Sequence, residues 1–195
     1  MNSLEYVKIP GDRIGVLVGT KGETKKDIQD KVGIALTVDK DGTVTIERTG
    51  DDPLAEWKGR DIVRAIARGV NPEKAMLLCR ENYMLEIIDL RDLVSGDRAL
   101  RRQKARIIGR SGKTRTHIED LTTCYISIYG KSVAIIGELE ELQVAKKAVV
   151  MLAIGKPHSA VYRFLQNKAR EFKERRMLHL WKKPGEGYED YPRPF

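Results

Sequence analysis

The sequence is poor in cysteine, in aromatic residues and in long apolar runs. Its two cysteines, Cys79 and Cys124, form no CxxC pair, which excludes a disulfide framework and argues against a zinc site. No apolar run approaches the roughly 18 residues of a membrane span. The first residues have neither the basic start nor the apolar stretch of a secretory signal. We therefore expect a cytoplasmic protein that has no membrane partner.

Charged residues are abundant, and the basic ones are unevenly distributed. Lys and Arg number 36 against 28 Asp and Glu, a net charge of +8, and 41% hydrophobic residues are enough for a packed core. The net charge is 0 over residues 1–82, +4 over 83–156 and +4 over 157–195. A basic surplus of this kind favours a polyanionic partner such as nucleic acid.

The chain contains an internal repeat at an offset of 90 residues, one residue shorter in its last segment. Such a repeat indicates two copies of one structural unit. Within each copy, alternating apolar residues predict strands and wider apolar spacing predicts helices. The matched segments are 18–22 with 108–112, 36–38 with 126–128, and 43–46 with 132–135.

Each copy predicts the order strand, helix, helix, strand, strand, helix. Three strands with helices on one face give an α+β fold class. Asp41-Gly42 predicts a hairpin turn in the first copy, and residues 129–131 predict one in the second. The expected first strands are 5–9 and 84–90, and the expected helices are 13–18, 23–32 and 53–68 in the first copy and 98–108, 113–122 and 138–154 in the second.

The repeat also sets the expected domain boundaries. A stripe on the last helix is expected to pack against a sheet edge or the other domain, with docking of a partner protein as the alternative. This stripe consists of Val161, Phe164, Leu165, Phe172 and Leu178. The expected units are a first domain at 1–70, a linker helix within 71–82, a second domain at 83–156, a basic C-terminal helix at 157–183 and a flexible tail at 184–195.

The most informative motif is a Gly-x-x-Gly sequence that leads into a helix in both copies. Glycine allows a sharp turn and close approach of another backbone, and a helix N-terminus attracts phosphate. Basic residues accompany both loops, at 21, 25 and 26 and at 110, 113 and 115. A helix-helix turn without a ligand is the alternative for a single GxxG, but two copies in the same setting favour phosphate binding.

This arrangement resembles two tandem type I KH domains that together cover the whole chain. The resemblance implies that each GxxG loop clamps single-stranded RNA over an aliphatic groove, and the low aromatic content of 6% suits such a groove. Lys25 and Arg115 depart from the family pattern, because an apolar residue usually occupies that position. The implied RNA-binding residues are Gly19, Thr20, Lys21, Gly22, Lys25, Arg106, Gly109, Arg110, Ser111, Gly112, Lys113 and Arg115. The implied groove floor consists of Ile14, Leu17, Val18, Ile28, Leu36, Ile107, Ile108, Ile118 and Ile126.

Two longer segments, 106–115 and 155–165, resemble the archaeal two-KH ribosomal-RNA-processing protein and its eukaryotic relatives, the Krr and Pno (Dim) small-subunit assembly factors. The resemblance implies binding to the 3′ region of 16S rRNA, beside the Nob endonuclease and the α subunit of translation initiation factor two. Because the first copy is neutral and the second is basic, we expect the main RNA contact in the second copy. Whether the first copy binds RNA or protein stays open.

Enzyme activity is not indicated. Residues 109–114 end like a nucleotide-binding loop, but the glycine that such a loop requires is replaced by Ile107. His117, His158 and His179 lack metal-ligand spacing, so we expect no metal, no cofactor and no catalysis. His117 is expected to be exposed or to face RNA. His158, which follows Pro157, is a candidate cap of the C-terminal helix. A protein-docking scaffold remains the second hypothesis. For RNA binding, we expect Gly109→Asp with Gly112→Asp to abolish the second clamp without unfolding the domain.

Overall fold

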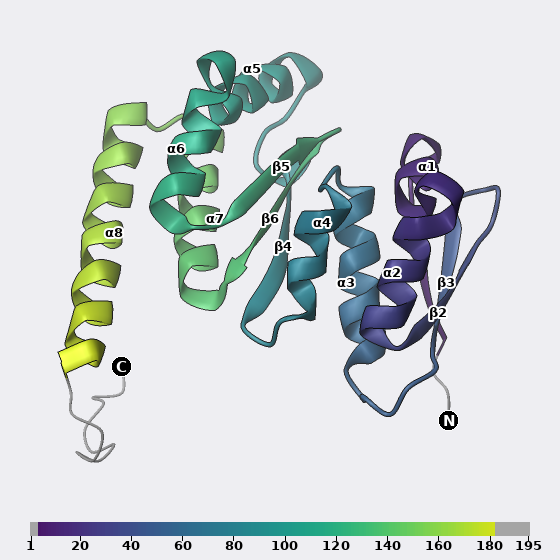
Figure 1. Ribbon diagram of the computed structural model, residues 1–195. Coiled ribbons are helices and arrows are strands. Elements are labelled where there is room, and N and C mark those ends of the chain that lie inside the picture. Colours follow the sequence, from purple (N-terminus) through teal and green to yellow (C-terminus); the bar gives the residue numbers. More distant parts are fainter. Residues whose placement is uncertain (1–3, 182–195) are drawn as a thin grey trace.

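The structure is a computed structural model that describes residues 4–181, with side chains described through residue 178. It contains the two expected copies of the strand-helix-helix-strand-strand-helix order (Figure 1), so the α+β prediction is confirmed. The first copy comprises β1 (Leu4–Lys8), α1 (Gly11–Val18), the 3₁₀ turn η1 (Thr20–Gly22), α2 (Glu23–Val32), β2 (Ile34–Val38), β3 (Thr43–Arg48) and α3 (Ala55–Ala67). The second comprises β4 (Tyr83–Asp89), η3 (Leu90–Asp92), α5 (Asp97–Ile108), η4 (Arg110–Gly112), α6 (Lys113–Thr122), β5 (Tyr125–Tyr129), β6 (Ser132–Glu138) and α7 (Leu139–Ala153).

The connecting segment is less regular than the single linker helix expected within 71–82. It consists of α4 (Pro72–Ala75) and the 3₁₀ turn η2 (Met76–Cys79). Asn71 caps α4, because its side-chain oxygen accepts the backbone N–H of Glu73 at 2.9 Å. Pro72 at the first helical position fits the same start signal.

Local contacts confirm the repeat residue by residue. In the first copy the side chain of Gln29 accepts the backbone N–H of Leu36 at 3.2 Å, and in the second Glu119 accepts that of Ile126 at 2.8 Å. Both pairs preserve the offset of 90 residues. In each copy the helix after the GxxG loop therefore holds the edge strand of its sheet.

The first sheet has the order β1-β3-β2 with antiparallel pairing, and only its inner face is buried. Along β3, Val44 and Ile46 are fully buried, whereas Thr43 and Thr45, which alternate with them, are partly exposed. Tyr6 on β1 is 63% exposed on the outer face. This alternation is typical of a strand with one face toward solvent.

The second sheet has the order β4-β6-β5, and both of its faces are covered. The run from Val133 to Ile136 on β6 is fully buried. Val133 and Ile135 face the helices of the second copy, while Ala134 and Ile136 belong to the hydrophobic core of the first. The outer face of this sheet therefore docks on the helices of the preceding copy.

Polar contacts fix this docking. The Ser127 hydroxyl donates to the carbonyl of Arg68 at 3.2 Å, and the Tyr129 hydroxyl donates to the carboxylate of Asp12. The ammonium of Lys74 lies 4.3 Å from the centre of the Tyr125 ring, a cation–π contact. The two copies are thus joined by a packed interface and by the connecting segment.

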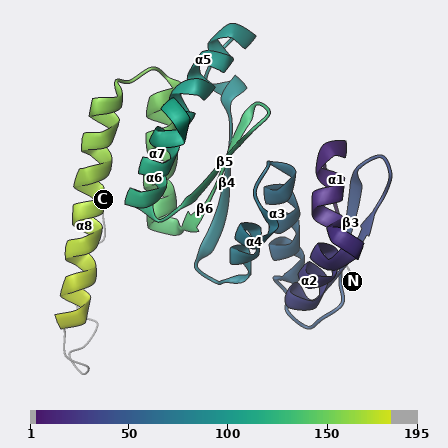
Figure 2. The same cartoon turned by 45° about the horizontal axis from the view of Figure 1, so that its top comes forward.

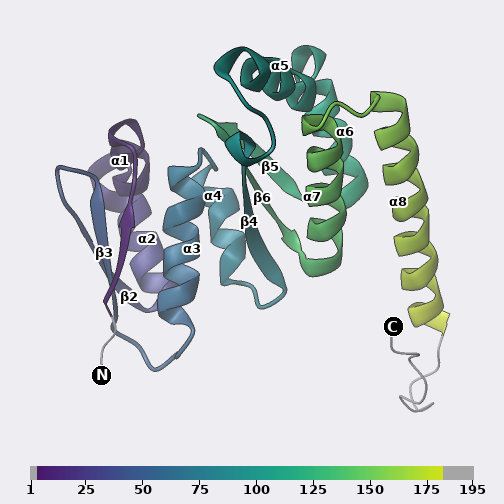
Figure 3. The same cartoon turned by 180° about the vertical axis from the view of Figure 1, so that it is seen from behind.

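The result is a stack of layers that ends in α8 (His158–Trp181). Figure 1 shows, from one end to the other, α8, the helices of the second copy, the second sheet, the helices α3 and α4, and the first sheet. The turned and rear views keep α8 and the first sheet at opposite ends (Figures 2 and 3). Helix α8 therefore covers the helices of the second copy much as the second sheet covers those of the first.

The apolar stripe of the last helix packs elsewhere than expected. Val161 and Leu165 are buried against α6 and α7, not against a sheet edge or the other domain, while Leu178 is 66% exposed. Ion pairs from Arg175 to Glu140 and from Arg176 to Glu141 hold the later turns of α8. The expected tail at 184–195 lies outside the described residues.

In residues 4–181, the part of the chain that the structure describes, no helix combines the length and the hydropathy needed to cross a bilayer. The same part contains no group of three His, Cys, Asp or Glu side chains placed to hold a metal ion.

Candidate nucleic-acid interface

The two GxxG loops have nearly identical backbones. Gly109 and Gly112 have φ angles of +75° and +80°, and Gly19 and Gly22 have +75° and +84°. The third residue of each loop, Lys21 or Ser111, is also left-handed, at +54° and +53°. Three left-handed residues in four give the tight turn that places a helix N-terminus beside the loop.

The two glycines of each loop differ in the space around them. A β-carbon on Gly109 would collide with the side chain of Thr114 and lie 2.7 Å from its backbone nitrogen, and one on Gly19 would lie 2.8 Å from that of Thr24. A β-carbon on Gly112 would meet nothing within 4 Å. The expectation that Gly109→Asp is structurally harmless is therefore wrong, since the first glycine has no room for a side chain.

The second loop is the more attractive of the two for an anion. Arg110, Ser111 and Lys113 are exposed, and the first turn of α6 contains no acidic residue. In the first copy, α2 begins with Glu23 at the position of Lys113. Because the helix dipole attracts anions most strongly when nearby side chains do not compete, α6 has the better N-terminus for phosphate.

The two residues that depart from the family pattern differ in their surroundings. Arg115 is exposed and forms an ion pair with Glu119 at 3.5 Å, one helical turn away. Lys25 is half-buried. Both copies therefore have a basic side chain on the first turns of the helix, although that of Arg115 is partly neutralised.

The predicted groove floor divides into two groups. Ile14, Val18 and Ile108 are partly exposed and lie at the surface beside the loops. The remaining members are at most 5% exposed and form core beneath that surface: Leu17, Ile28, Leu36, Ile107, Ile118 and Ile126. The buried group belongs to the two hydrophobic cores, and only the partly exposed group is accessible to a ligand.

Arg106, which the resemblance assigns to RNA, has a protein partner. Its Nη2 donates to the carbonyl of Lys156 in the connection between α7 and α8, and its Nε is buried without a partner among the described residues. The guanidinium group is thus directed to the connection.

Helix α5 has further exposed basic residues that were not among the predicted RNA-binding residues. Arg98, Arg101 and Arg102 are exposed on this helix, which leads directly into the second loop. Lys104 donates to the carbonyl of Gly130 at 3.1 Å and so ties α5 to the β5–β6 turn. The corresponding helix α1 is shorter. The Arg-rich segment 98–102 was the signal that would have identified them.

The first turns of α8 contact the two helices that flank the second loop, α5 and α6. The Tyr162 hydroxyl lies 3.1 Å from the Oγ1 of Thr114, and its ring packs edge-on against His117 at 4.6 Å. The ring nitrogen Nε2 of His158 lies 3.1 Å from the carbonyl oxygen of Arg106. His117 is therefore half-buried against α8 rather than fully exposed, and His158 contacts α5 rather than capping its own helix.

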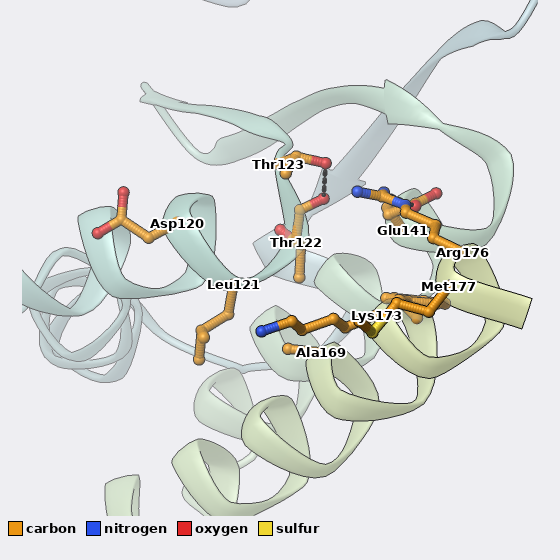
Figure 4. A pocket seen from close by; sticks show the side chains of 10 residues that line it. Asp120, Leu121, Thr122, Thr123, Glu141, Ala169, Lys173, Arg176 and Met177 are labelled. Carbon is orange, nitrogen blue, oxygen red and sulfur yellow. Dashed lines mark hydrogen bonds and ion pairs between the residues drawn. The ribbon is translucent and has the colours of Figure 1, made fainter. Parts of the chain in front are cut away.

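A pocket of about 320 Å³ lies at the opposite end of α6, between this helix and α8 (Figure 4). Leu121 and Met177 line it, and Arg176 crosses its rim toward Glu141. Because it lies at the far end of α6 from the GxxG loop, this pocket belongs to the packing of α8 and not to the candidate interface.

Family models match both copies. The model described as KH domain matches residues 4–63, and the model described as eukaryotic type KH-domain (KH-domain type I) matches residues 84–170. The second match extends past the start of α8. It therefore includes the turns of α8 that contact α5 and α6.

Relatives and solved structures agree with this assignment. KH domain-containing protein MJ0443 of Methanocaldococcus jannaschii is 50% identical over 97% of this chain and 84% of its own length. The pre-rRNA-processing protein pno1 of Schizosaccharomyces pombe is 35% identical over 64% of this chain, which spans only 52% of that longer protein. A crystal structure of an a/eIF2alpha-aDim2p-rRNA complex from Pyrococcus horikoshii OT3 contains a chain that is 48% identical, with a TM-score of 0.83 over 87% of this chain and 96% of that one.

Proposed function

Because the chain belongs to the Pno1/Dim2 family of proteins with two KH domains, we propose that it binds single-stranded RNA during maturation of the small ribosomal subunit. The target that we propose is the 3′ region of 16S rRNA. The role is that of a binding and assembly factor in the cytoplasm, without catalysis by this chain.

One observation carries the proposal for the second copy. Its GxxG loop combines a tight left-handed backbone, exposed Arg110 and Lys113, and a helix N-terminus free of acidic residues in its first turn. Backbone phosphate fits such a site, because it is bound by positive side chains and by N–H groups at the helix end. The partly exposed Ile108 offers an apolar surface beside it for an unstacked base.

The first copy is proposed to have a protein partner as well as, or in place of, RNA. Its loop geometry is intact, but Glu23 occupies the start of α2. A similar Dim2 protein was crystallised with both a/eIF2alpha and rRNA. We therefore include the α subunit of translation initiation factor two among the partners, with the Nob endonuclease as a further candidate.

The direct test is a fluorescence-anisotropy titration with three labelled RNAs at two salt concentrations. These are a single strand that matches the 3′ end of 16S rRNA, a scrambled strand of equal composition and a duplex. We expect preferential, salt-sensitive binding to the 3′-end strand, because phosphate contacts release counterions while bases are read only when unpaired.

Two outcomes would contradict the proposal. Equal affinity for all three RNAs would leave only a nonspecific basic surface. Absence of binding to any of them, with the protein folded by circular dichroism, would favour the protein-docking hypothesis for both copies.

A further inference from the structure

The first turns of α8 contact both helices that flank the second GxxG loop, and we propose that Tyr162 is a positioning residue for RNA binding by that loop. The Tyr162 hydroxyl hydrogen-bonds with the hydroxyl of Thr114, which packs directly beneath Gly109. The inference rests on the proposed function, because it concerns the same loop. It goes further by assigning a role in RNA binding to the C-terminal helix.

Thr114 is the link between α8 and the loop. It is only 4% exposed, and its side chain fills the space that a β-carbon on Gly109 would need. A shift of this side chain would therefore be transmitted directly to the backbone of Gly109. Its hydroxyl is 3.1 Å from that of Tyr162, within hydrogen-bonding distance.

Tyr162 is itself held in place from several sides. Val161 and Leu165, its neighbours on α8, are buried in the core of the second copy. The rings of His117 and His158 pack edge-on against the Tyr162 ring, with centroid distances of 4.6 Å and 6.0 Å. These contacts hold the phenol of Tyr162 in place, and its hydroxyl in turn positions the side chain of Thr114.

A second contact ties the start of α8 to the helix on the other side of the loop. His158 Nε2 lies 3.1 Å from the carbonyl oxygen of Arg106, and the guanidinium group of Arg106 donates to the carbonyl of Lys156. These contacts hold α5, which enters the loop, while Tyr162 holds α6, which leaves it. The beginning of α8 therefore contacts both helices that flank the second loop.

The first copy provides an internal control. Thr24 packs beneath Gly19 as Thr114 packs beneath Gly109. Within residues 4–181 no helix lies beside the first loop as α8 lies beside the second, because α8 is at the opposite end of the molecule (Figure 1). A GxxG loop therefore forms without this contact, so the role of Tyr162 is to fix the loop's position and not to create the turn.

The test compares Tyr162→Phe with Tyr6→Phe, a change on the exposed outer face of the first sheet. We expect Tyr162→Phe to bind the 3′-end RNA about tenfold more weakly, because one partly buried hydrogen bond is lost. Its melting temperature is expected to stay within a few degrees of wild type. Tyr6→Phe should bind as wild type does.

A double-mutant cycle with Thr114→Val separates positioning from general destabilisation. In the Thr114→Val background, Tyr162→Phe should have no further effect on affinity, because the partner hydroxyl is already absent. Independent, additive losses would overturn the proposal. So would an unchanged affinity of Tyr162→Phe in a protein whose wild type binds the RNA.

Hydrogen exchange of the free protein provides a readout that does not depend on RNA. Tyr162→Phe should accelerate exchange of the amides at 109–112 severalfold and leave those at 19–22 unchanged. Equal rates in wild type and variant would refute the positioning role whether or not RNA binds. If exchange changes as expected while the wild type binds no RNA, then the proposed function fails and the structural contact stands.

Discussion

The central strands of the two sheets, β3 and β6, occupy the same position in the repeat but have opposite surroundings. Along β3 buried and partly exposed residues alternate, whereas β6 is buried from Ser132 to Gly137. Thr45 on β3 corresponds to Ala134 on β6, which packs into the core of the first copy. One fold thus accepts a polar or an apolar outer face, according to whether another layer covers it.

The two GxxG loops share a backbone geometry but differ in their electrostatic surroundings. Their backbones agree within about ten degrees at each left-handed residue. Their electrostatic surroundings differ, since Glu23 begins α2 whereas Lys113 begins α6. Both copies retain the turn, although the side chains that surround it differ in charge.

The largest expected effect comes from placing the same charge on the two central strands. Ala134→Lys would bury an ammonium group between the second sheet and the helices of the first copy, so we expect a loss of several kcal/mol of stability. Thr45→Lys places the group on the open outer face and should change stability by less than about 0.5 kcal/mol. Urea unfolding followed by circular dichroism measures both changes.

This comparison also tests the interface between the copies. Equal small effects of both substitutions would mean that the second sheet does not dock on the first copy in solution. Equal large effects would mean that the outer face of the first sheet is covered as well.

The second prediction concerns the middle residues of the two loops. Arg110→Asp with Ser111→Asp should weaken binding of the 3′-end RNA by at least tenfold, because two carboxylates then face phosphate. Both side chains are exposed, and aspartate tolerates the left-handed conformation at position 111. We expect the fold to be preserved, unlike in a Gly109→Asp variant, and anisotropy with a thermal melt measures the two properties.

The matched control is Thr20→Asp with Lys21→Asp in the first loop. A smaller loss from this pair is expected, given the acidic start of α2. If the first-loop pair is the more damaging of the two, the assignment of the main RNA contact to the second copy is wrong.

The smallest expected effect comes from exchanging the residues that begin the two helices. Lys113→Glu should flatten the dependence of log affinity on log salt by about 0.7, the value for one phosphate contact on a single strand. Glu23→Lys should leave that slope unchanged if the first copy does not contact RNA, and steepen it by a similar amount if it does. Affinities at four or more salt concentrations give the slopes.

Much of the fold was predictable from local pattern. The repeat offset, the Asp41-Gly42 turn and the glycine pairs located nearly every element within two residues, because periodicity and turn chemistry act over a few neighbouring residues. The prediction of a single linker helix was wrong in detail, since the segment forms a short helix followed by a 3₁₀ turn. The continuous apolar run of β6 is typical of a strand covered on both faces, but the run alone does not show which helices cover its outer face.

The candidate site was predicted less completely than the fold. The loop residues follow from the motif, but a sequence pattern does not distinguish the partly exposed Ile108 from the buried Ile107 beside it. Nor does it show that Arg106 faces the connection to α8. Such distinctions depend on which side of a helix a neighbouring element covers.

The sequence by itself determined the α+β repeat, the two GxxG turns and the basic character of the second copy, because each follows from residues close together in the chain. The tertiary structure alone decided that the second sheet rests on the helices of the first copy and that Tyr162 reaches Thr114, 48 residues earlier in the chain. Contacts at such separations depend on how whole layers pack. Packing is set by the combined shape of many side chains and not by any local pattern.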